Sequence, residues 1–211
     1  MTFPFAEAAH ASSELADVES VRGWRALERG SEPGLPHDEL VAAIRKRRSV
    51  RRYAVEPLPR EQLAELLAWS EAPIPADVPR VVSQVVTVAA VEGLRPGIYD
   101  AELNLLHERD EDELRAAAGF AAMEQEHPQL AAVNVFQVAD LDEVVSRMGD
   151  RGYRWAQLEA GIRAGRLQIG AFMRGWGAAA STFYDDEVSK LLEIEAAPLL
   201  MVAVGRRRTR S

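Results

Sequence analysis

Two short stretches of the sequence concentrate positive charge. Six of the eight residues from Arg45 to Arg52 are basic, and four of the last six, Arg206 to Ser211, are arginine. The first stretch places guanidinium groups and a hydroxyl close together, on Arg47, Arg48, Ser49 and Arg51. Arginine binds a phosphate monoester through paired N–H groups, and a serine hydroxyl supplies a neutral donor. The pattern therefore indicates a phosphate site, with a solvated helix end, whose dipole favours cations, as the alternative.

The rest of the composition narrows the classes of partner. The chain has 211 residues, with 33 acidic residues against 25 Lys and Arg, so its formal net charge is −8. A net negative protein is repelled by polyanions, and the basic stretches lack interleaved aromatic residues, so we expect neither nucleic acid nor an anionic membrane as a partner. Cysteine is absent and the four histidines are dispersed, so we expect no disulfide, no cysteine nucleophile and no metal site.

Targeting signals are not apparent in the sequence. The N-terminus has no basic segment followed by an apolar run, and the longest apolar stretch, Ala196 to Val204, is too short to span a bilayer. We therefore expect a cytoplasmic protein without a membrane segment.

Residues 1–36 and 37–211 differ in character. The first 36 residues are rich in Ala, Ser, Glu, Gly and Pro with weak periodicity, which predicts an N-terminal arm or extension. The compact domain is expected over residues 37–211. It should open with a helix through Leu40, Val41 and Ile44, followed by a second helix after Pro59 and a proline-rich loop from Pro73 to Pro79.

The following segments mix helical and extended patterns. Strands are expected over residues 81–91, 131–139, 178–182 and 198–204, with a hairpin over residues 97–106 and helices after residues 110, 140 and 184. Because strands and helices do not alternate strictly, the order favours an α+β fold over a doubly wound sheet.

A long helix is expected from Tyr153 to Trp176. Its apolar residues recur every three to four positions, but Gly161, Gly165 and Gly170 lie among them. Each glycine costs about 1 kcal/mol of helix stability relative to alanine, so a close backbone approach to another helix or to a ligand should compensate.

Six motifs occur along the chain in a characteristic order. They are Arg47-Arg48-Ser49-Val50-Arg51-Arg52-Tyr53, Glu56-Pro57-Leu58-Pro59, Gly97-Ile98-Tyr99-Asp100, Asp150-Arg151-Gly152-Tyr153-Arg154, Leu158-Glu159-Ala160-Gly161 and Tyr184-Asp185-Asp186-Glu187-Val188. The series resembles the FMN-dependent nitroreductase superfamily over about residues 38–205. It most resembles the SagB-type dehydrogenase branch, which includes oxidases that aromatise azoline heterocycles in ribosomally made peptides.

The resemblance implies a nitroreductase-like α+β homodimer, with a central, mostly antiparallel sheet surrounded by helices and FMN at the dimer interface. The segment with Arg47, Arg48, Ser49 and Arg51 matches the family's grip on the FMN phosphate and ribityl chain. The basic tail adds Arg206 and Arg208 as candidates for the same phosphate. Ala180, Ser181 and Thr182 match the segment whose backbone N–H groups approach the flavin N5 edge. The long glycine-containing helix matches the core helix of the dimer interface.

Two functional interpretations follow. The first is an FMN-dependent oxidoreductase that transfers hydride through flavin N5, on a small-molecule or peptide substrate, with a partner enzyme in a biosynthetic pathway. The second is a non-catalytic binding or scaffold subunit, because the loop Ala72–Pro79 and the positions Ile162, Gly165 and Arg166 lack the family's usual ring contacts. The proton-transfer candidates Tyr153, Glu159 and Tyr184 are more readily structural, so no catalytic residue is assigned.

Overall fold

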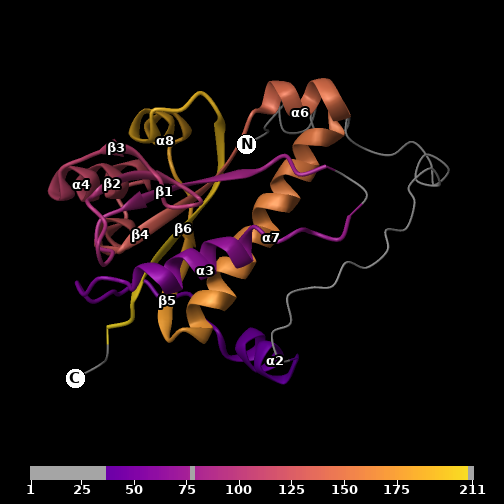
Figure 1. Cartoon of the computed structure of the whole chain (residues 1–211). Helices are drawn as coiled ribbons and strands as arrows, with labels where there is room; N and C mark the ends of the chain where they lie inside the picture. Colours follow the sequence, from indigo (N-terminus) through magenta and orange to yellow (C-terminus); the bar gives the residue numbers. More distant parts are fainter. Residues whose placement is uncertain (1–36, 77–78, 209–211) are drawn as a thin grey trace, which may run out of the picture.

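The computed structural model describes residues 37–76 and 79–208 of the chain (Figure 1). In chain order the elements are α2 (His37–Lys46), α3 (Arg60–Ser70), β1 (Ser83–Val88), β2 (Gly97–Asp100), β3 (Leu105–Glu108), α4 (Glu111–Ala121), α5 (Glu126–Leu130), β4 (Val133–Ala139), α6 (Leu141–Met148), α7 (Arg151–Met173), β5 (Trp176–Ser181), α8 (Asp185–Leu192) and β6 (Ala197–Arg206). This irregular order of helices and strands confirms the α+β class. The expected arm, residues 1–36, lies outside the described residues.

One six-stranded sheet forms the centre of the fold, in the order β3-β2-β1-β4-β6-β5. Neighbouring strands are antiparallel throughout this sheet. Strand β4 lies inside the sheet and all seven of its residues are buried, as its run of alternating apolar residues predicts. The expectation of a mostly antiparallel sheet is therefore confirmed.

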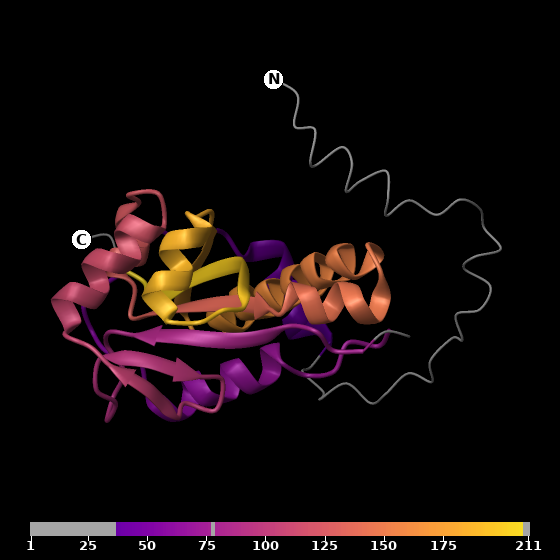
Figure 2. The same cartoon turned by 90° about the horizontal axis from the view of Figure 1, so that it is seen from above.

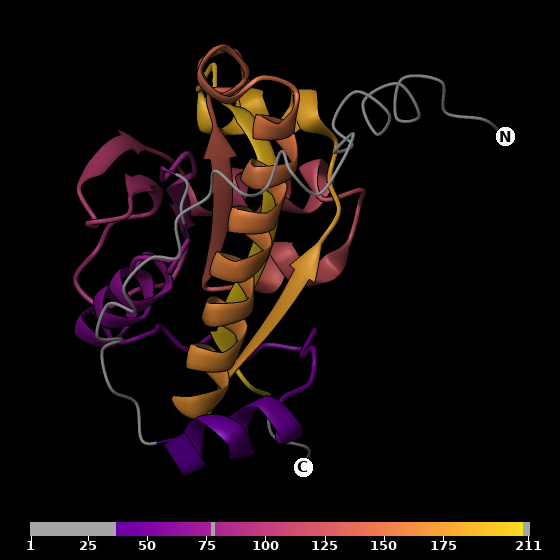
Figure 3. The ribbon, with the colours of Figure 1, turned by 90° about the vertical axis from the view of Figure 1, so that its right-hand side faces the viewer.

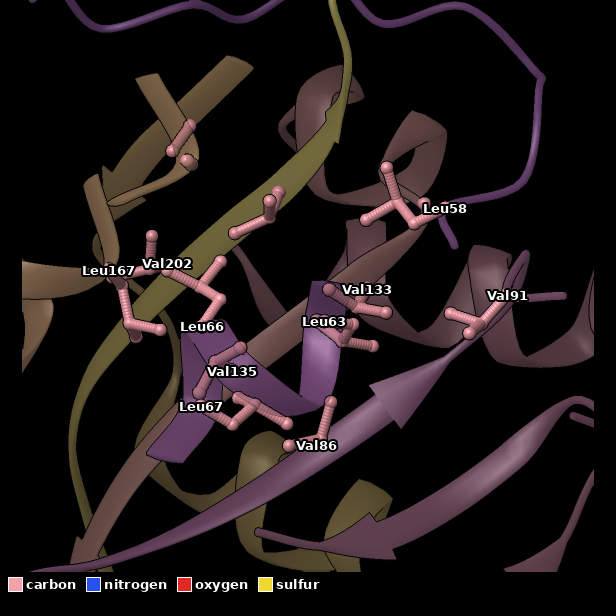
Figure 4. Packing of buried hydrophobic residues seen from close by; sticks show 14 of the residues in the cluster. Leu58, Leu63, Leu66, Leu67, Val86, Val91, Val133, Val135, Leu167 and Val202 are labelled. Atoms are coloured by element: carbon pink, nitrogen blue, oxygen red, sulfur yellow. The ribbon is translucent and has the colours of Figure 1, made fainter. Parts of the chain in front are cut away.

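Helices cover the sheet on both faces. Figure 2 shows α3 on one side of the sheet and α4 and α8 on the other. On the α3 side, Leu63, Leu66 and Leu67 point toward valines of β1, β4 and β6 (Figure 4), and all three leucines are fully buried. Burying one such side chain contributes about 1.5–3 kcal/mol, so this cluster is a main source of stability. On the other side, Phe136 and Met201 pack with residues of α4 and α8.

Several boundaries differ from those expected. Strand β3 begins at Leu105, because the carboxylate of Asp100 accepts hydrogen bonds from the backbone N–H groups of Glu102 and Asn104 and holds a turn there. Helix α7 ends at Met173 rather than Trp176, since Gly175 adopts a left-handed conformation, with φ of 73°, that stops the helix. Trp176 is instead the first residue of β5.

Helix α7 runs alongside the sheet, and Figure 3 shows it along its whole length. A Cβ at Gly170 would lie 2.5 Å from Leu66 Cδ1, so this glycine permits α3 and α7 to approach closely, as expected. Within the described chain, a Cβ at Gly161 or Gly165 would meet no atom within 4 Å, so these two glycines face open space. No helix in the described ranges is long and apolar enough to cross a membrane.

Candidate functional site

The two basic stretches lie side by side in the fold. The backbone N–H of Ala54 donates to the carbonyl of Arg206 at 2.9 Å, and that of Arg208 donates to the carbonyl of Arg52 at 3.2 Å. Tyr53 and Arg207 form an antiparallel bridge between these two contacts. The backbone therefore brings together the two stretches that were expected to converge on one anion. We call residues 47–52 and 206–208 together the basic site.

Tyr53 fixes this pairing. Its ring is buried against Gly205, where a Cβ would lie 2.9 Å from the ring carbon Cγ, so a larger residue would displace the ring. Its hydroxyl donates to the carbonyl of Ala203 at 3.0 Å. Burial raises the pKa of Tyr53 above its ordinary value, more than the charge of Arg51 lowers it, so the hydroxyl keeps its proton and remains a donor.

The side chains of the basic site differ in their partners. Arg47 Nη1 donates to Gln168 Oε1 on α7 at 3.0 Å. Arg206 Nε donates to the carbonyl of Pro57 at 3.1 Å and lies 3.7 Å from a carboxylate oxygen of Glu56. The other five cations of the site make no ion pair with any carboxylate of the described residues: Arg48, Arg51, Arg52, Arg207 and Arg208. All five are exposed, as is Ser49. In a chain of net charge −8, unpaired arginines on adjacent segments favour an external anion.

The segment expected at the flavin edge lies on the strand that the basic site touches. Val50 N–H donates to the carbonyl of Ala178 in β5 at 3.0 Å, two residues before Ala180. Ser181 is nearly buried, and its hydroxyl donates to the carbonyl of Thr182 at 3.2 Å. The structure therefore places Ala180 and Ser181 on the strand that the basic site contacts, β5, and Thr182 directly after it.

An exposed apolar surface adjoins Thr182. Thr182 Oγ1 donates to Met123 Sδ at 3.2 Å, and the rings of Phe120 and Tyr184 are 6.3 Å apart. Phe120, Met123 and Tyr184 are each between 44% and 51% exposed. Tyr184, a proton-transfer candidate, thus belongs to a ring pair on the surface beside residues 180–182.

Glu159, another proton-transfer candidate, has a structural role. Its side chain is 2% exposed and pairs with Arg163 Nη2 at 2.6 Å. The other carboxylate oxygen accepts from the backbone N–H of Val81 at 2.9 Å and of Val82 at 3.2 Å. These bonds fix the start of β1 and leave Glu159 enclosed, so it is no proton donor to an external substrate.

The proline-rich loop is held by α7 at both ends. Arg166 donates to the carbonyls of Ala72 and Pro73, the latter at 3.2 Å, and Trp155 Nε1 donates to the carbonyl of Pro79 at 2.9 Å. Arg166, which departs from the family pattern, therefore binds the loop backbone. Asp77, the single carboxylate expected in this loop, lies outside the described residues.

His127 on α5 was not singled out by sequence reasoning. It is 4% exposed, and its Nε2 atom is buried without a hydrogen-bond partner. Burial, and then the charge of Arg51, lower its pKa. Ala131, which directly follows α5, packs in one buried cluster with Tyr53, so the end of α5 lies close to the basic site. No residue pattern predicted this position, because α5 has only five residues, Pro128 among them.

Two surface clefts of the described chain lie elsewhere. One of about 280 Å³ is lined by β1 and α6 residues such as Ser83 and Val144, and one of about 320 Å³ is lined by α4 and α8 residues such as Leu114 and Leu191. Neither contains a residue expected in the cofactor site.

Comparison with known proteins identifies the family. The sequence pattern of the nitroreductase family matches residues 44–206. A protein of Methanocaldococcus jannaschii that is named a nitroreductase is 27% identical over 188 residues, which cover 83% of this chain and 94% of that relative. A solved structure named a nitroreductase, from Anabaena variabilis, is 27% identical with a TM-score of 0.71, covering 81% of this chain but only 38% of the Anabaena chain.

A more distant structure shares the fold. The NADPH:FMN oxidoreductase of Vibrio harveyi, solved in complex with NAD+, is 18% identical with a TM-score of 0.62, and the match covers 81% of this chain and 70% of that one. The family pattern extends over most of the chain and over every strand that brings the basic site together. This chain therefore belongs to the nitroreductase family of oxidoreductases.

Proposed function

We propose that the protein is an FMN-dependent oxidoreductase whose basic site binds the FMN phosphate. The observation that carries the proposal is the pairing of residues 52–54 with 206–208, which gathers arginines that, apart from Arg206, have no carboxylate partner among the described residues. A phosphate monoester carries close to two negative charges at neutral pH, and arginine binds it with charge-assisted hydrogen bonds. The chemistry of this donor set therefore fits the phosphate end of FMN.

Different residues would bind different parts of the cofactor. Arg47, Arg48, Ser49, Arg51 and Arg208 would hold the phosphate and ribityl chain. Arg206 would join them by giving up its ion pair with Glu56, which is weak because the Glu56 side chain is 73% exposed. Backbone N–H groups in the segment Ala180, Ser181 and Thr182 would face the flavin ring. Bound FMN supplies hydride transfer through its N5 atom.

The finer assignment is to the SagB-type branch, acting in the cytoplasm on a peptide or small molecule within a biosynthetic pathway. This assignment is supported by the positions in the fold of the motifs that resemble the SagB-type branch. Gly97 to Asp100 forms β2, where Gly97 closely faces the backbone of β3 and leaves no room for a side chain. Leu158 to Gly161 lies on α7. Exposed Phe120, Met123 and Tyr184 beside Thr182 would give an apolar substrate a surface to contact.

We also propose a homodimer that forms along the outer side of α7. Leu158 is 57% exposed on this helix, and Gly161 and Gly165 face open space. Small residues allow a second backbone to approach closely, and its contacts would offset the helix stability that the two glycines cost. The proposed cofactor site is open on the described chain, and a second copy would enclose it.

The absorbance spectrum of the freshly purified protein tests the flavin proposal, followed by titration with FMN and riboflavin. We expect flavin absorbance bands or, for flavin-free protein, saturable FMN binding. Arg47→Ala combined with Arg51→Ala should weaken FMN while leaving riboflavin affinity nearly unchanged, because riboflavin lacks the phosphate. A colourless protein that does not bind FMN would contradict the proposal and favour the non-catalytic scaffold.

A further inference from the structure

Arg47 is set apart from the rest of its cluster by a partner on a distant element. Its Nη1 donates to Gln168 Oε1 at 3.0 Å, and the two residues are 121 positions apart in the sequence. Within the described ranges, no other side chain of residues 45–52 makes a hydrogen bond to a charged or amide side chain. Both Arg47 and Gln168 are partly buried, so the contact is shielded but reachable from solvent. One guanidinium of the basic site is thus oriented before any ligand arrives.

Gln168 is itself held firmly. Two residues earlier on α7, Arg166 donates to the loop carbonyls of Ala72 and Pro73. Two residues later, Gly170 packs directly against Leu66 and Trp69 of α3. The backbone that carries Gln168 is therefore fixed on both sides, and the amide oxygen offers Arg47 a stationary acceptor.

The chemical nature of the acceptor matters. An amide oxygen accepts a hydrogen bond without carrying a net charge, so it orients the guanidinium and leaves its positive charge available. A carboxylate of the same length would also accept the bond, but it would neutralise the guanidinium and compete with an incoming anion. A free arginine side chain loses rotamer entropy when it is ordered, so orientation in advance favours binding.

We propose that Gln168 is a positioning residue for the basic site: its amide oxygen holds Arg47 ready for the phosphate of the cofactor without neutralising it. The inference rests on the proposed function, because it takes that phosphate to be the anion bound by Arg47. It adds a residue outside the matched motif and assigns it a role through Arg47 rather than through contact with the ligand.

Two variants test the role of Gln168. Gln168→Glu keeps the length of the side chain and adds the competing charge, whereas Gln168→Met keeps the length and removes the acceptor. The measurements are dissociation constants for FMN and for riboflavin, and the melting temperature of the flavin-free protein. Gln157→Glu, the same substitution on the same helix but bonded to Tyr153 instead, is the matched control for added charge.

The expected results separate positioning from folding. Gln168→Glu should weaken FMN about tenfold or more, leave riboflavin within about twofold, and keep or raise the melting temperature, because Arg47 gains an ion pair. Gln168→Met should weaken FMN about three- to tenfold, the equivalent of one hydrogen bond, again without affecting riboflavin. Gln157→Glu should change neither affinity.

Three outcomes would overturn the inference. Unchanged FMN affinity in Gln168→Glu would do so while leaving the proposed function intact, provided that Arg47→Ala with Arg51→Ala still loses FMN. Equal weakening of FMN and riboflavin with a lower melting temperature would show that Gln168 only supports the fold. Absence of FMN binding by the unmodified protein would defeat the proposed function and this inference together.

Discussion

Among single residues, the buried pair of Glu159 and Arg163 is a point at which a substitution should strongly destabilise the fold. Both side chains are 2% exposed, and Arg163 Nη1 also lies 3.3 Å from Glu71. Arg163→Met would leave the Glu159 carboxylate buried without its cation, and we expect a loss of about 3–5 kcal/mol in the free energy of unfolding. Adding Glu159→Gln to that variant should recover part of the loss. Urea unfolding of the three variants checks this, and a double variant as unstable as the sum of the singles would contradict it.

His127 should make the free energy of unfolding fall as the pH is lowered. Its pKa is lowered in the folded state, by burial and then by Arg51, whereas an unfolded histidine binds a proton near pH 6.5, about its ordinary value. On acidification the unfolded chain therefore takes up more protons than the folded chain, and stability falls. Between about pH 7 and about pH 5 we expect the free energy of unfolding to fall less in His127→Gln than in the unmodified protein.

Urea unfolding at a series of pH values measures this difference. The carboxylates that titrate nearby are common to both proteins, so their contribution cancels in the comparison. His107→Gln, which removes a histidine whose side chain is 42% exposed, is the control. An identical pH slope in His127→Gln and the unmodified protein would show that the buried histidine carries no such linkage.

Among the helices and strands, the sequence predicted those in which burial imposes a regular pattern of apolar residues. Strand β4 was predictable because every residue from Val133 to Ala139 is buried between two neighbouring strands. Helix α5 was not predictable, because five residues are too few to show a helical repeat. Pro128 is also typical of a helix end, although proline is tolerated in a first helical turn. Hydrophobic periodicity also does not predict where an element ends when a single contact sets that end, as the hydrogen bonds of Glu159 do just before β1.

The packing of α7 on α3 depends on a glycine that the sequence did single out. In Gly170→Ala the new methyl would lie 2.5 Å from Leu66 Cδ1 and 2.9 Å from Trp69 Cε3, so these side chains or one of the two helices must shift. Overpacking of this kind costs about 1–3 kcal/mol, against about 1 kcal/mol gained in helix propensity, and we expect lower net stability. The same change in a Leu66→Ala background should cost less, because the obstructing methyl is gone. Equal costs in both backgrounds, measured by thermal unfolding, would exclude this contact as the cause.

Across the molecule, the basic site is formed by segments far apart in the sequence, and hydrophobic periodicity cannot predict that they lie together. Tyr53 and Ala203 are 150 residues apart, and their hydrogen bond belongs to the pairing that brings the two basic stretches together. Only the order of motifs along the chain suggested this convergence. The ion pair of Arg206 with Glu56 and the hydrogen bond of Arg47 to Gln168 depend on side-chain geometry, so no sequence pattern predicted them.

The assembly state is the prediction that concerns the molecule as a whole. If two copies meet along α7, the native mass should be twice the chain mass of 23.3 kDa, and Leu158→Glu should shift the protein to the monomer because it buries an unpaired charge in the interface. Leu106→Glu is the matched control, since Leu106 is a 46% exposed leucine on the edge strand β3, away from α7. Sedimentation velocity distinguishes the species. If the second copy closes the proposed cofactor site, Leu158→Glu should also weaken FMN, whereas Leu106→Glu should not. A protein that sediments as a monomer yet binds FMN tightly would show that one chain completes the site alone.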